Sequence, residues 1–371
     1  MDAARSLRSQ FPVLERNAYL NAGTCGPVPE TARAAALDAW EYATGEGRSG
    51  AFYERLIPLS EELRARYARL LNASADHVAL TAGTSDGCAH VIAALGLKPG
   101  DEVLTADDEH PGVTGPLIAA REQRGVTVKA VPLAEIPGAI SDTTTLVACS
   151  HVSWHSGAVA PVAEIVAAAA RFDVPVLLDG AQGVGAIGLD VAALGVPFYA
   201  GSGQKWLCGP VGTGMLYVSP EWTERLGSPA PSYGGLTDHA AGLASGLVAN
   251  ARRHDTPLRD LSIVAAAVAA FDVLDAFGFQ ALQERAAGLA ARLADELRAR
   301  GATVIDRGAT TLVAWDAGGD EAAVAARDRL QAAGVTIRDL PGAGRLRASV
   351  GAWNDEDDLD RLLSGLGGGA A

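Results

Sequence analysis

The sequence predicts an α/β protein with two domains, a large one built on a mostly parallel sheet and a smaller one that follows it. Two observations lead to this prediction. Between residues 78 and 218, short apolar runs alternate with helical segments, as in sheets whose strands are joined by helices. Several runs, such as residues 145–150 and 174–179, are apolar at consecutive positions, which is typical of strands covered on both faces.

Seven runs are predicted to form the strands of the large domain. They are residues 77–81, 101–106, 126–131, 145–150, 174–179, 197–201 and 214–218. Helices are predicted between them at residues 86–96, 110–125 and 162–172. In such sheets, ligands bind beyond the carboxyl ends of the strands, so functional side chains are expected there.

A different pattern begins near residue 258. One long amphipathic helical region, residues 261–301, leads into a smaller α/β unit. Its predicted strands are residues 302–306, 311–317, 335–340 and 345–350, and its predicted helices are residues 321–334 and 355–366. The predicted domains are therefore residues 17–255 and residues 256–371, with residues 1–16 packed against the second. Residues 19–29 are expected to be an extended segment that crosses into the large domain.

Composition excludes several functional classes. The formal net charge of −14 argues against nonspecific nucleic-acid binding, and no apolar stretch is long enough to span a membrane. The N-terminal residues lack the pattern of a signal peptide. The four cysteines have the spacing of neither a disulfide framework nor a zinc site. We expect a cytoplasmic protein without metal, nucleic-acid or membrane partners.

Lys205 is the most informative single residue. The 30 basic residues of this chain include only three lysines, and Lys205 lies between the glycines of residues 201–214. A primary amine can lose its proton and attack a carbonyl carbon, whereas a guanidinium cannot. The alternative is a surface lysine in a glycine loop. Ser202 and Gln204 add polar groups beside it, suited to a phosphate.

Two further motifs follow predicted strands. Gly83, Thr84 and Ser85 open a helix, and the free amides of a helix's first turn form an anion site. The same residues are also compatible with an ordinary strand–helix turn. His110 follows the strand at 101–106 and is placed to stack on a planar ring or to move a proton, unless it is only a turn residue.

Asp179 ends the apolar run at 174–179, a costly place for a carboxylate unless it meets a cation or strong donors. A pyridinium N–H is such a partner, and Gln182, three residues later, is placed to reach a neighbouring phenolate oxygen. The alternative is an aspartate that caps a helix. Residues 183–188 fit the G-x-G-x-x-G pattern, but no long helix or ribose-binding acid follows, which argues against a dinucleotide site.

Together these groups meet the needs of pyridoxal 5′-phosphate (PLP), whose protonated ring withdraws electrons from carbanions. The sequence resembles the class V aminotransferase/cysteine desulfurase-like family of fold-type I PLP enzymes. The motifs that carry the resemblance are YLNAGTCGP, GTSDG, EH, SHVSWHSGAV, DGAQ, SGQK and RASVGAWNDEDDLD. The resemblance implies PLP as cofactor, a seven-stranded α/β/α large domain, and a homodimer with its active site at the interface.

The resemblance also implies residue roles. Lys205 would bond covalently to the cofactor, Asp179 would pair with the pyridine nitrogen, and His110 would stack on the ring. The other cofactor contacts implied are Gln182 to the ring oxygen and Gly83, Thr84, Ser85, Ser202, Gln204 and, from a neighbouring subunit, Thr256 to the phosphate. Arg347 matches the arginine that binds the substrate α-carboxylate, a pairing that suits a planar guanidinium.

The chain departs from the family pattern at two places. Cysteine desulfurases carry a nucleophilic cysteine shortly before the carboxylate-binding arginine, and residues 335–347 contain none. Cys25 and Cys208 are the nearest replacements by motif position. Trp154 stands where desulfurases commonly have asparagine, so Trp154 and His155 are expected to shape the substrate pocket, unless Trp154 serves only packing.

The predicted function is PLP-dependent chemistry at the Cα of a small-molecule substrate, a free or slightly modified amino acid. The enzyme would be a cysteine desulfurase-like carbon–sulfur lyase or an aminotransferase, in either case without the loop cysteine. The alternatives are an amino-acid epimerase of the same family and a PLP-binding protein with little turnover.

Overall fold

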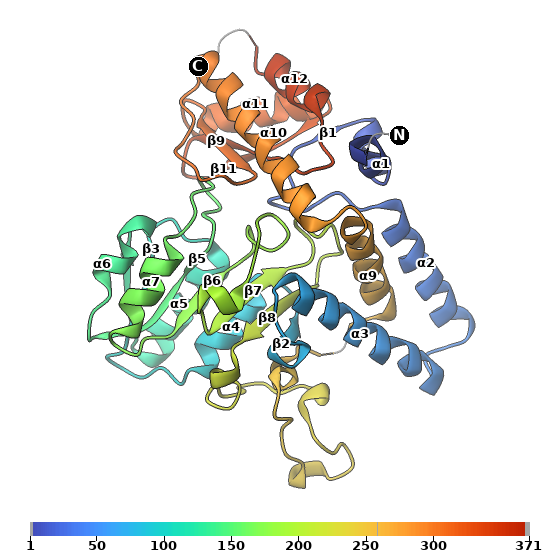
Figure 1. Cartoon of the computed structure of the whole chain (residues 1–371), viewed down its shortest axis with the longest axis vertical. Coiled ribbons are helices and arrows are strands. Elements are labelled where there is room, and N and C mark those ends of the chain that lie inside the picture. The colour runs from blue at the N-terminus through green and yellow to red at the C-terminus, as the bar shows by residue number, and fades with distance from the viewer. Residues whose placement is uncertain (1–2, 258, 368–371) are drawn as a thin grey trace.

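The computed structural model of the chain describes residues 3–257 and 259–367. Its larger part contains a seven-stranded sheet, and its smaller part, formed mainly by C-terminal residues, lies above the sheet in Figure 1. The predicted α/β fold with a large, mostly parallel sheet and a smaller α/β unit is confirmed. The limits assigned to the two domains stay a prediction.

The large sheet has the strand order β2-β8-β7-β6-β5-β3-β4. All neighbouring strands are parallel except β8, which runs antiparallel to both β2 and β7. The strands are β2 (Val78–Thr81), β3 (Glu102–Ala106), β4 (Thr127–Val131), β5 (Thr144–Ser150), β6 (Val176–Asp179), β7 (Phe198–Ser202) and β8 (Gly214–Val218). All seven predicted strands are therefore present.

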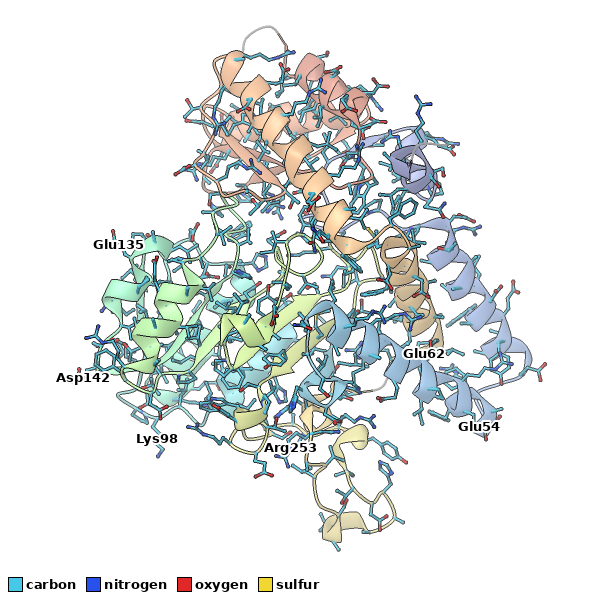
Figure 2. All side chains as sticks on the ribbon, in the orientation of Figure 1. Glu54, Glu62, Lys98, Glu135, Asp142 and Arg253 are labelled. Carbon is cyan, nitrogen blue, oxygen red and sulfur yellow. The ribbon has the colours of Figure 1, made fainter. Side chains whose placement is uncertain are left out.

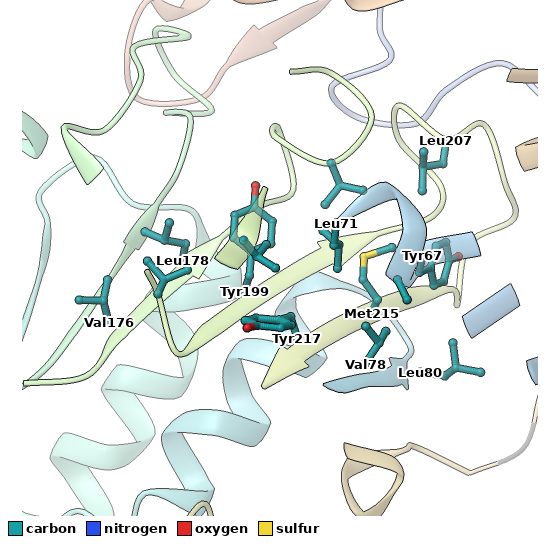
Figure 3. Packing of buried hydrophobic residues seen from close by; sticks show 14 of the residues in the cluster. Tyr67, Leu71, Val78, Leu80, Val176, Leu178, Tyr199, Leu207, Met215 and Tyr217 are labelled. Carbon is teal, nitrogen blue, oxygen red and sulfur yellow. The ribbon is translucent and has the colours of Figure 1, made fainter. Parts of the chain in front are cut away.

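Consecutive apolar residues of a strand pack on opposite faces of this sheet. Leu178 and Tyr199 pack with Tyr67 and other side chains on one face, as Figure 3 shows. Leu177, the residue before Leu178, packs with a different cluster on the other face. Burying such a side chain stabilises the fold by roughly 1.5–3 kcal/mol, which is why the central strands are apolar throughout.

Helices cover both faces of the large sheet. The predicted helices are present as α4 (Thr84–Ala94), α5 (Pro111–Arg124) and α7 (Val162–Ala170). Two long helices that the sequence did not predict, α2 (Glu30–Gly45) and α3 (Gly50–Leu70), lie at one end of the large part (Figure 1). The shorter segments are α6 (Ile136–Ala139), α8 (Val191–Leu194), η1 (Pro12–Glu15), η2 (Ala75–His77), η3 (Leu133–Glu135), η4 (Pro220–Trp222), η5 (Tyr233–Gly235), η6 (Gly242–Ala244) and η7 (Ala251–His254).

The helical region predicted at 261–301 is present, but as two helices. The region forms α9 (Leu261–Asp275) and α10 (Phe279–Ala299), bent by 77°. Gly278 separates them with a φ of +78°, a conformation that glycine adopts readily and that ends a helix. Among the described residues, no single helix is both long and apolar enough to cross a membrane. Only this bent pair has sufficient length and hydrophobicity, and only when its two helices are taken as one segment.

The smaller part contains two short sheets. One has the antiparallel order β11-β12-β9, and the other pairs β1 with β10 in parallel. The elements are β1 (Ala18–Tyr19), β9 (Leu312–Asp316), β10 (Val335–Thr336), β11 (Arg338–Leu340), β12 (Arg345–Ser349), α11 (Asp320–Ala332) and α12 (Glu356–Gly365). The strand predicted at 302–306 is wrong, because this segment forms only one isolated bridge, between Val304 and Trp315.

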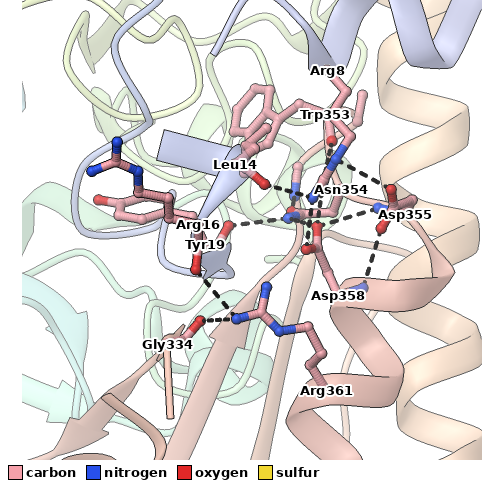
Figure 4. A network of polar contacts seen from close by, with 12 residues as sticks. Arg8, Leu14, Arg16, Tyr19, Gly334, Trp353, Asn354, Asp355, Asp358 and Arg361 are labelled. Atoms are coloured by element: carbon pink, nitrogen blue, oxygen red, sulfur yellow. Dashed lines mark hydrogen bonds and ion pairs between the residues drawn. The ribbon is translucent and has the colours of Figure 1, made fainter. Parts of the chain in front are cut away.

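The N-terminal segment is fastened to the smaller part. Figure 4 shows Arg8, at the end of α1 (Ala3–Arg8), donating to the buried carboxylate of Asp358 at 2.7 Å and to the carbonyl of Leu14 at 3.0 Å. Asn354 donates to the carbonyl of Tyr19 at 3.1 Å. Charged side chains such as Glu54, Lys98 and Asp142 lie at the periphery instead (Figure 2).

Candidate active site

A cavity of about 430 Å³ lies at the carboxyl ends of the strands of the large sheet, where the sequence predicted it. It is bounded by the ends of β2, β6 and β7 and by residues of the smaller part. The lining residues are Gly23, Thr24, Ala82, Gly83, Thr84, Ser85, Asp86, His110, Asp179, Ala181, Ser202, Gln204, Lys205 and Arg338.

One end of the cavity is suited to an anion. Helix α4 begins there at Thr84, whose N–H donates to Ser202 Oγ at 3.1 Å, and the two hydroxyl oxygens are 2.6 Å apart. The buried Oε1 atom of Gln204 has no hydrogen-bond partner among the described residues. A half-turn of that amide presents its NH₂ donors instead. Hydroxyls, an amide and a helix N-terminus thus converge at this end.

Lys205 lies in the turn between β7 and β8. The segment that contains Gly26 packs directly on this turn, with the Gly26 N–H donating to Gln204 O at 2.8 Å. A Cβ atom at Gly26 would lie 2.1 Å from the carbonyl oxygen of Lys205, so only glycine fits. Burial lowers the pKa of Lys205 to about 8, and Arg347 also lowers it, whereas Asp179 raises it. A substantial fraction of the amine is therefore neutral near pH 8.

Asp179 ends β6 and is buried. Its Oδ1 atom accepts a hydrogen bond from the N–H of Ala181 at 2.9 Å. Burial raises the pKa of the Asp179 carboxyl, while Lys205 and the Ala181 N–H lower it. A buried carboxylate in this balance is stabilised by any further cation or N–H donor that enters the cavity.

His110 presents a neutral ring. Its Nδ1 atom accepts from the N–H of Gly112 at 3.0 Å, which caps α5, and its ring meets that of Trp154 edge-on with centroids 5.1 Å apart. Burial lowers the pKa of His110 to about 4, with Lys205 as the next cause. The imidazole is therefore uncharged at neutral pH, as suits stacking against a flat heterocycle.

Arg347 lies just behind the wall of the cavity. It is completely buried, and its Nη1 atom donates to Trp154 O at 2.6 Å. Its Nη2 atom is 3.5 Å from Thr24 Oγ1, and a Cβ atom added to Gly23 would lie 3.0 Å from it. Its Nε atom has no partner among the described residues. Burial and then Arg338 lower the pKa of Arg347 to about 9, so it stays cationic at neutral pH.

The structure brings most of the predicted site residues together, and the others lie outside the cavity lining. Gln182 donates to Gly23 O at 2.9 Å and accepts from Trp206 at 3.0 Å, so its amide is engaged elsewhere. The Thr256 hydroxyl accepts from Arg259 at 2.7 Å, and Trp154 donates to the carbonyl of Asp108. His155 packs edge-on against Trp154. The roles given to all these residues stay predictions.

Sequence reasoning missed several residues of this site, among them Thr24 and two charged residues. Arg338 lines the cavity and is the register partner of Arg347 between β11 and β12. Pairing the predicted strands 335–340 and 345–350 as a hairpin would have found it. The other is Glu109, next to His110, whose buried carboxylate accepts two hydrogen bonds from Ser150. Its signal was a carboxylate placed directly before the histidine at a strand end.

The sequence profile of the aminotransferase class-V family matches residues 19–362. The chain belongs to the class-V aminotransferase family. The resemblance seen in the motifs is thereby confirmed, and with it the expectation of a PLP-dependent enzyme.

Relatives within this family carry different activities. A cysteine desulfurase of Dickeya dadantii is 28% identical over 97% of this chain and 95% of its own length. An isopenicillin N epimerase of Amycolatopsis lactamdurans is 29% identical over 94% of each chain. A probable cysteine desulfurase of Methanothermobacter thermautotrophicus is 34% identical, but the match covers 58% of this chain and 56% of the relative.

Solved structures agree with the fold. A complex between the cystine C–S lyase C-DES and its reaction product cysteine persulfide matches with a TM-score of 0.90 and 27% identity. The match covers 96% of this class-V chain and 98% of the other. A C-DES variant with glycine covalently linked to its PLP cofactor gives a TM-score of 0.91, at 26% identity and the same coverage of both chains.

Proposed function

We propose that this class-V enzyme is a PLP-dependent carbon–sulfur lyase that releases sulfur from the β-carbon of an amino acid without passing it to a protein cysteine. The observation that carries the proposal is the connection between β11 and β12. It consists of residues 341–344 and contains no cysteine. The N–H groups of Gly342 and Gly344 donate to the carboxylate of Asp320 at 3.2 and 2.7 Å. The connection is thus held against α11.

The cysteines elsewhere in the chain are poor replacements. Cys88, Cys149 and Cys208 are completely buried, and burial raises the pKa of each thiol well above its usual value. Cys25 is partly exposed, and burial raises the pKa of its thiol as well, although Lys205 opposes this. A cysteine accepts sulfur as its thiolate, and none of these thiols ionises readily. The sulfur is therefore expected to leave the enzyme in a small-molecule product.

The residues of the cavity fit PLP. The amide of Gln204, whose unpartnered oxygen leaves it free to turn its NH₂ donors toward the cavity, suits the phosphate together with the first turn of α4. Thr84, Ser85 and Ser202 are further contacts. The buried Asp179 suits its ring nitrogen, and Lys205 suits its aldehyde. When bound, PLP supplies an electron sink that stabilises negative charge on the substrate's α-carbon.

The chain's own residues would then divide the work. The Lys205 amine, with a pKa of about 8, is matched to accept the proton from the α-carbon near neutral pH. Arg347 and Thr24 would orient the α-carboxylate. The Cβ–S bond breaks with its electron pair leaving on sulfur, and the remaining three-carbon fragment hydrolyses to pyruvate and ammonia.

Product analysis tests this function. The holoenzyme is incubated with L-cystine and with L-cysteine, and pyruvate, ammonia, sulfane sulfur and alanine are quantified. One pyruvate for each sulfur-containing product supports the lyase. Alanine as the main carbon product means a desulfurase, and a D-amino acid without sulfur release means an epimerase. A keto acid of an intact amino acid, formed as the bound cofactor takes up the amino group, means transamination.

We also propose that the enzyme acts as a homodimer in the cytoplasm. Large apolar side chains are exposed on the large part, among them Trp40 of α2, Ile57 of α3 and Leu243 of the segment that projects downward in Figure 1. Contact between two copies of the chain would remove such side chains from water. Light scattering on the purified holoenzyme gives the oligomeric state directly, and a monomer would rule out a shared active site.

A further inference from the structure

Two arginines meet at one hydroxyl of the cavity wall. Arg338 on β11 and Arg347 on β12 are register partners in the small antiparallel sheet. The Nη1 atom of Arg338 and the Nη2 atom of Arg347 each lie 3.5 Å from Thr24 Oγ1. Two positive charges are therefore held within several ångströms of each other, on the side of the cavity formed by the smaller part.

Within residues 3–257 and 259–367, neither arginine forms an ion pair, whereas the largely buried Arg64 is paired with Asp255 at 2.7 Å. The buried Nε atom of Arg347 has no hydrogen-bond partner in the described part of the chain. In a chain with a formal net charge of −14, two neighbouring arginines without an acid stand out. Such a pair is stabilised by negative charge brought in by a ligand.

Arg338 is the arginine of the pair that lines the cavity. Its guanidinium carbon lies 5.7 Å from the centre of the Trp154 ring, and its Nε atom donates to the carbonyl of Asp339 at 3.1 Å. These contacts hold the side chain in place while leaving the remaining N–H groups for a ligand. The proposed function uses one arginine, Arg347, for the α-carboxylate. A second, pre-positioned guanidinium is then available for a second anion.

We propose that Arg338 determines substrate specificity by binding a second anionic group, which the substrate carries beyond its sulfur atom. This inference rests on the proposed lyase function and deepens it. The preferred substrates are then amino acids whose β-sulfur bears an anionic substituent, such as cystine or S-sulfocysteine. Breaking the Cβ–S bond releases cysteine persulfide from cystine and thiosulfate from S-sulfocysteine. In both cases the charge that Arg338 binds leaves with the sulfur, together with the electron pair of the broken bond.

A matched pair of disulfides tests the proposal. L-Cystine and the mixed disulfide of L-cysteine with cysteamine differ only in the distal carboxylate. The wild-type holoenzyme is expected to have at least a tenfold higher kcat/KM for cystine, as one charge-assisted contact supplies. Arg338→Gln should abolish this preference through a higher KM for cystine. It should change kcat/KM for the mixed disulfide less than about threefold.

Two further variants complete the design. Arg338→Lys keeps the charge and should retain part of the preference. Arg345→Gln removes one positive charge from β12 at a residue outside the cavity lining and should leave both substrates unaffected. Unfolding midpoints of all variants separate a folding defect from a loss of recognition.

The outcomes are distinct. A loss that Arg338→Gln imposes equally on both disulfides would assign Arg338 to the α-carboxylate and overturn the proposal, as would no loss at all. If the wild-type enzyme forms pyruvate from neither disulfide, the lyase function fails instead. The affinities of the two compounds, measured from the change they cause in the cofactor's absorbance, still decide on Arg338 in that case. If wild type and Arg338→Gln bind cystine with the same affinity, the inference is overturned.

Discussion

Glu109 accepts two hydrogen bonds from Ser150, one from the backbone N–H at 2.6 Å and one from the hydroxyl at 2.8 Å. The pair links the segment after β3, which carries His110, to the carboxyl end of β5. Burial and the neighbouring Asp179 raise the pKa of the Glu109 carboxyl to about 7, against the lowering effect of the Ser150 hydrogen bonds. Glu109, a carboxyl group beside the cavity rather than in its lining, is therefore expected to lose its proton near neutral pH.

Glu109→Gln should change how stability depends on pH. The folded state holds the proton of Glu109 up to about pH 7, whereas an unfolded glutamate loses it near 4.5. Wild-type stability therefore falls as pH rises between these values, and glutamine, which does not ionise, lacks this loss. Between pH 5 and pH 8, the unfolding free energy of Glu109→Gln should therefore rise by about 2–3 kcal/mol relative to that of the wild type.

Urea denaturation at both pH values measures the effect of this substitution. Glu54→Gln, on an exposed part of α3, is the control for replacing a glutamate elsewhere. A constant difference between wild type and Glu109→Gln at the two pH values would contradict the prediction.

Lys205 should be labelled selectively and at an unusually low pH. When the apoprotein reacts with PLP and is trapped with borohydride, labelling should rise through a midpoint near pH 8, where the Lys205 amine loses its proton. Peptides with Lys98 and Lys129 serve as internal controls in mass spectrometry. Arg347→Met should raise the midpoint, because the Arg347 charge lowers the pKa of Lys205. A midpoint near pH 10 would show a solvent-exposed amine.

Ser202→Ala should weaken cofactor binding. Its hydroxyl accepts from the Thr84 N–H and contacts the Thr84 hydroxyl, so the substitution removes one group of the anion site and disturbs a second. Loss of a hydrogen bond to a charged group corresponds to about a tenfold higher Kd for PLP. Fluorescence titration of the apoprotein measures this, with Thr84→Ser as the variant that keeps both hydroxyls. An unchanged Kd would place the phosphate elsewhere.

The sequence predicted those parts of the molecule that depend on local pattern. The strands were found because runs such as 174–179 are apolar at consecutive positions. Asp179 ends one of these strands, and His110 and Lys205 follow others. Helix α2 escaped prediction because it shows no apolar stripe, since it fully buries only alanines and exposes Trp40.

The position of Arg338 could be predicted only in part. Pairing residues 335–340 with residues 345–350 places it beside Arg347, but its approach to the cavity depends on contacts between distant parts of the chain. The register between β11 and β12 and the approach of Thr24 together bring this arginine to the cavity. The same holds for Gln182, whose amide is bound by Gly23 and Trp206. The motif around Gln182 predicts neither of these contacts.

Asp255→Ala should destabilise the fold far more than removal of an exposed acid. Asp255 accepts two hydrogen bonds from Arg64, at 2.9 and 2.7 Å, and one from the Leu80 N–H at 2.8 Å. The side chains of Arg64 and Asp255 are only 3% and 13% exposed. Removing one partner leaves a buried charge uncompensated, which costs about 3–5 kcal/mol.

Asp272→Ala is the matched control, because Asp272 also forms a two-bond pair with an arginine of α3, Arg66. The side chains of Asp272 and Arg66 are 51% and 19% exposed, so losing this ion pair should cost about 0–1 kcal/mol of stability. Denaturation curves of the three proteins give both values. A small loss for Asp255→Ala would mean that Glu61, 3.2 Å from Arg64, compensates the buried guanidinium by itself. In that case the link from η7 to β2 would depend on the backbone bond between Thr256 and Leu80.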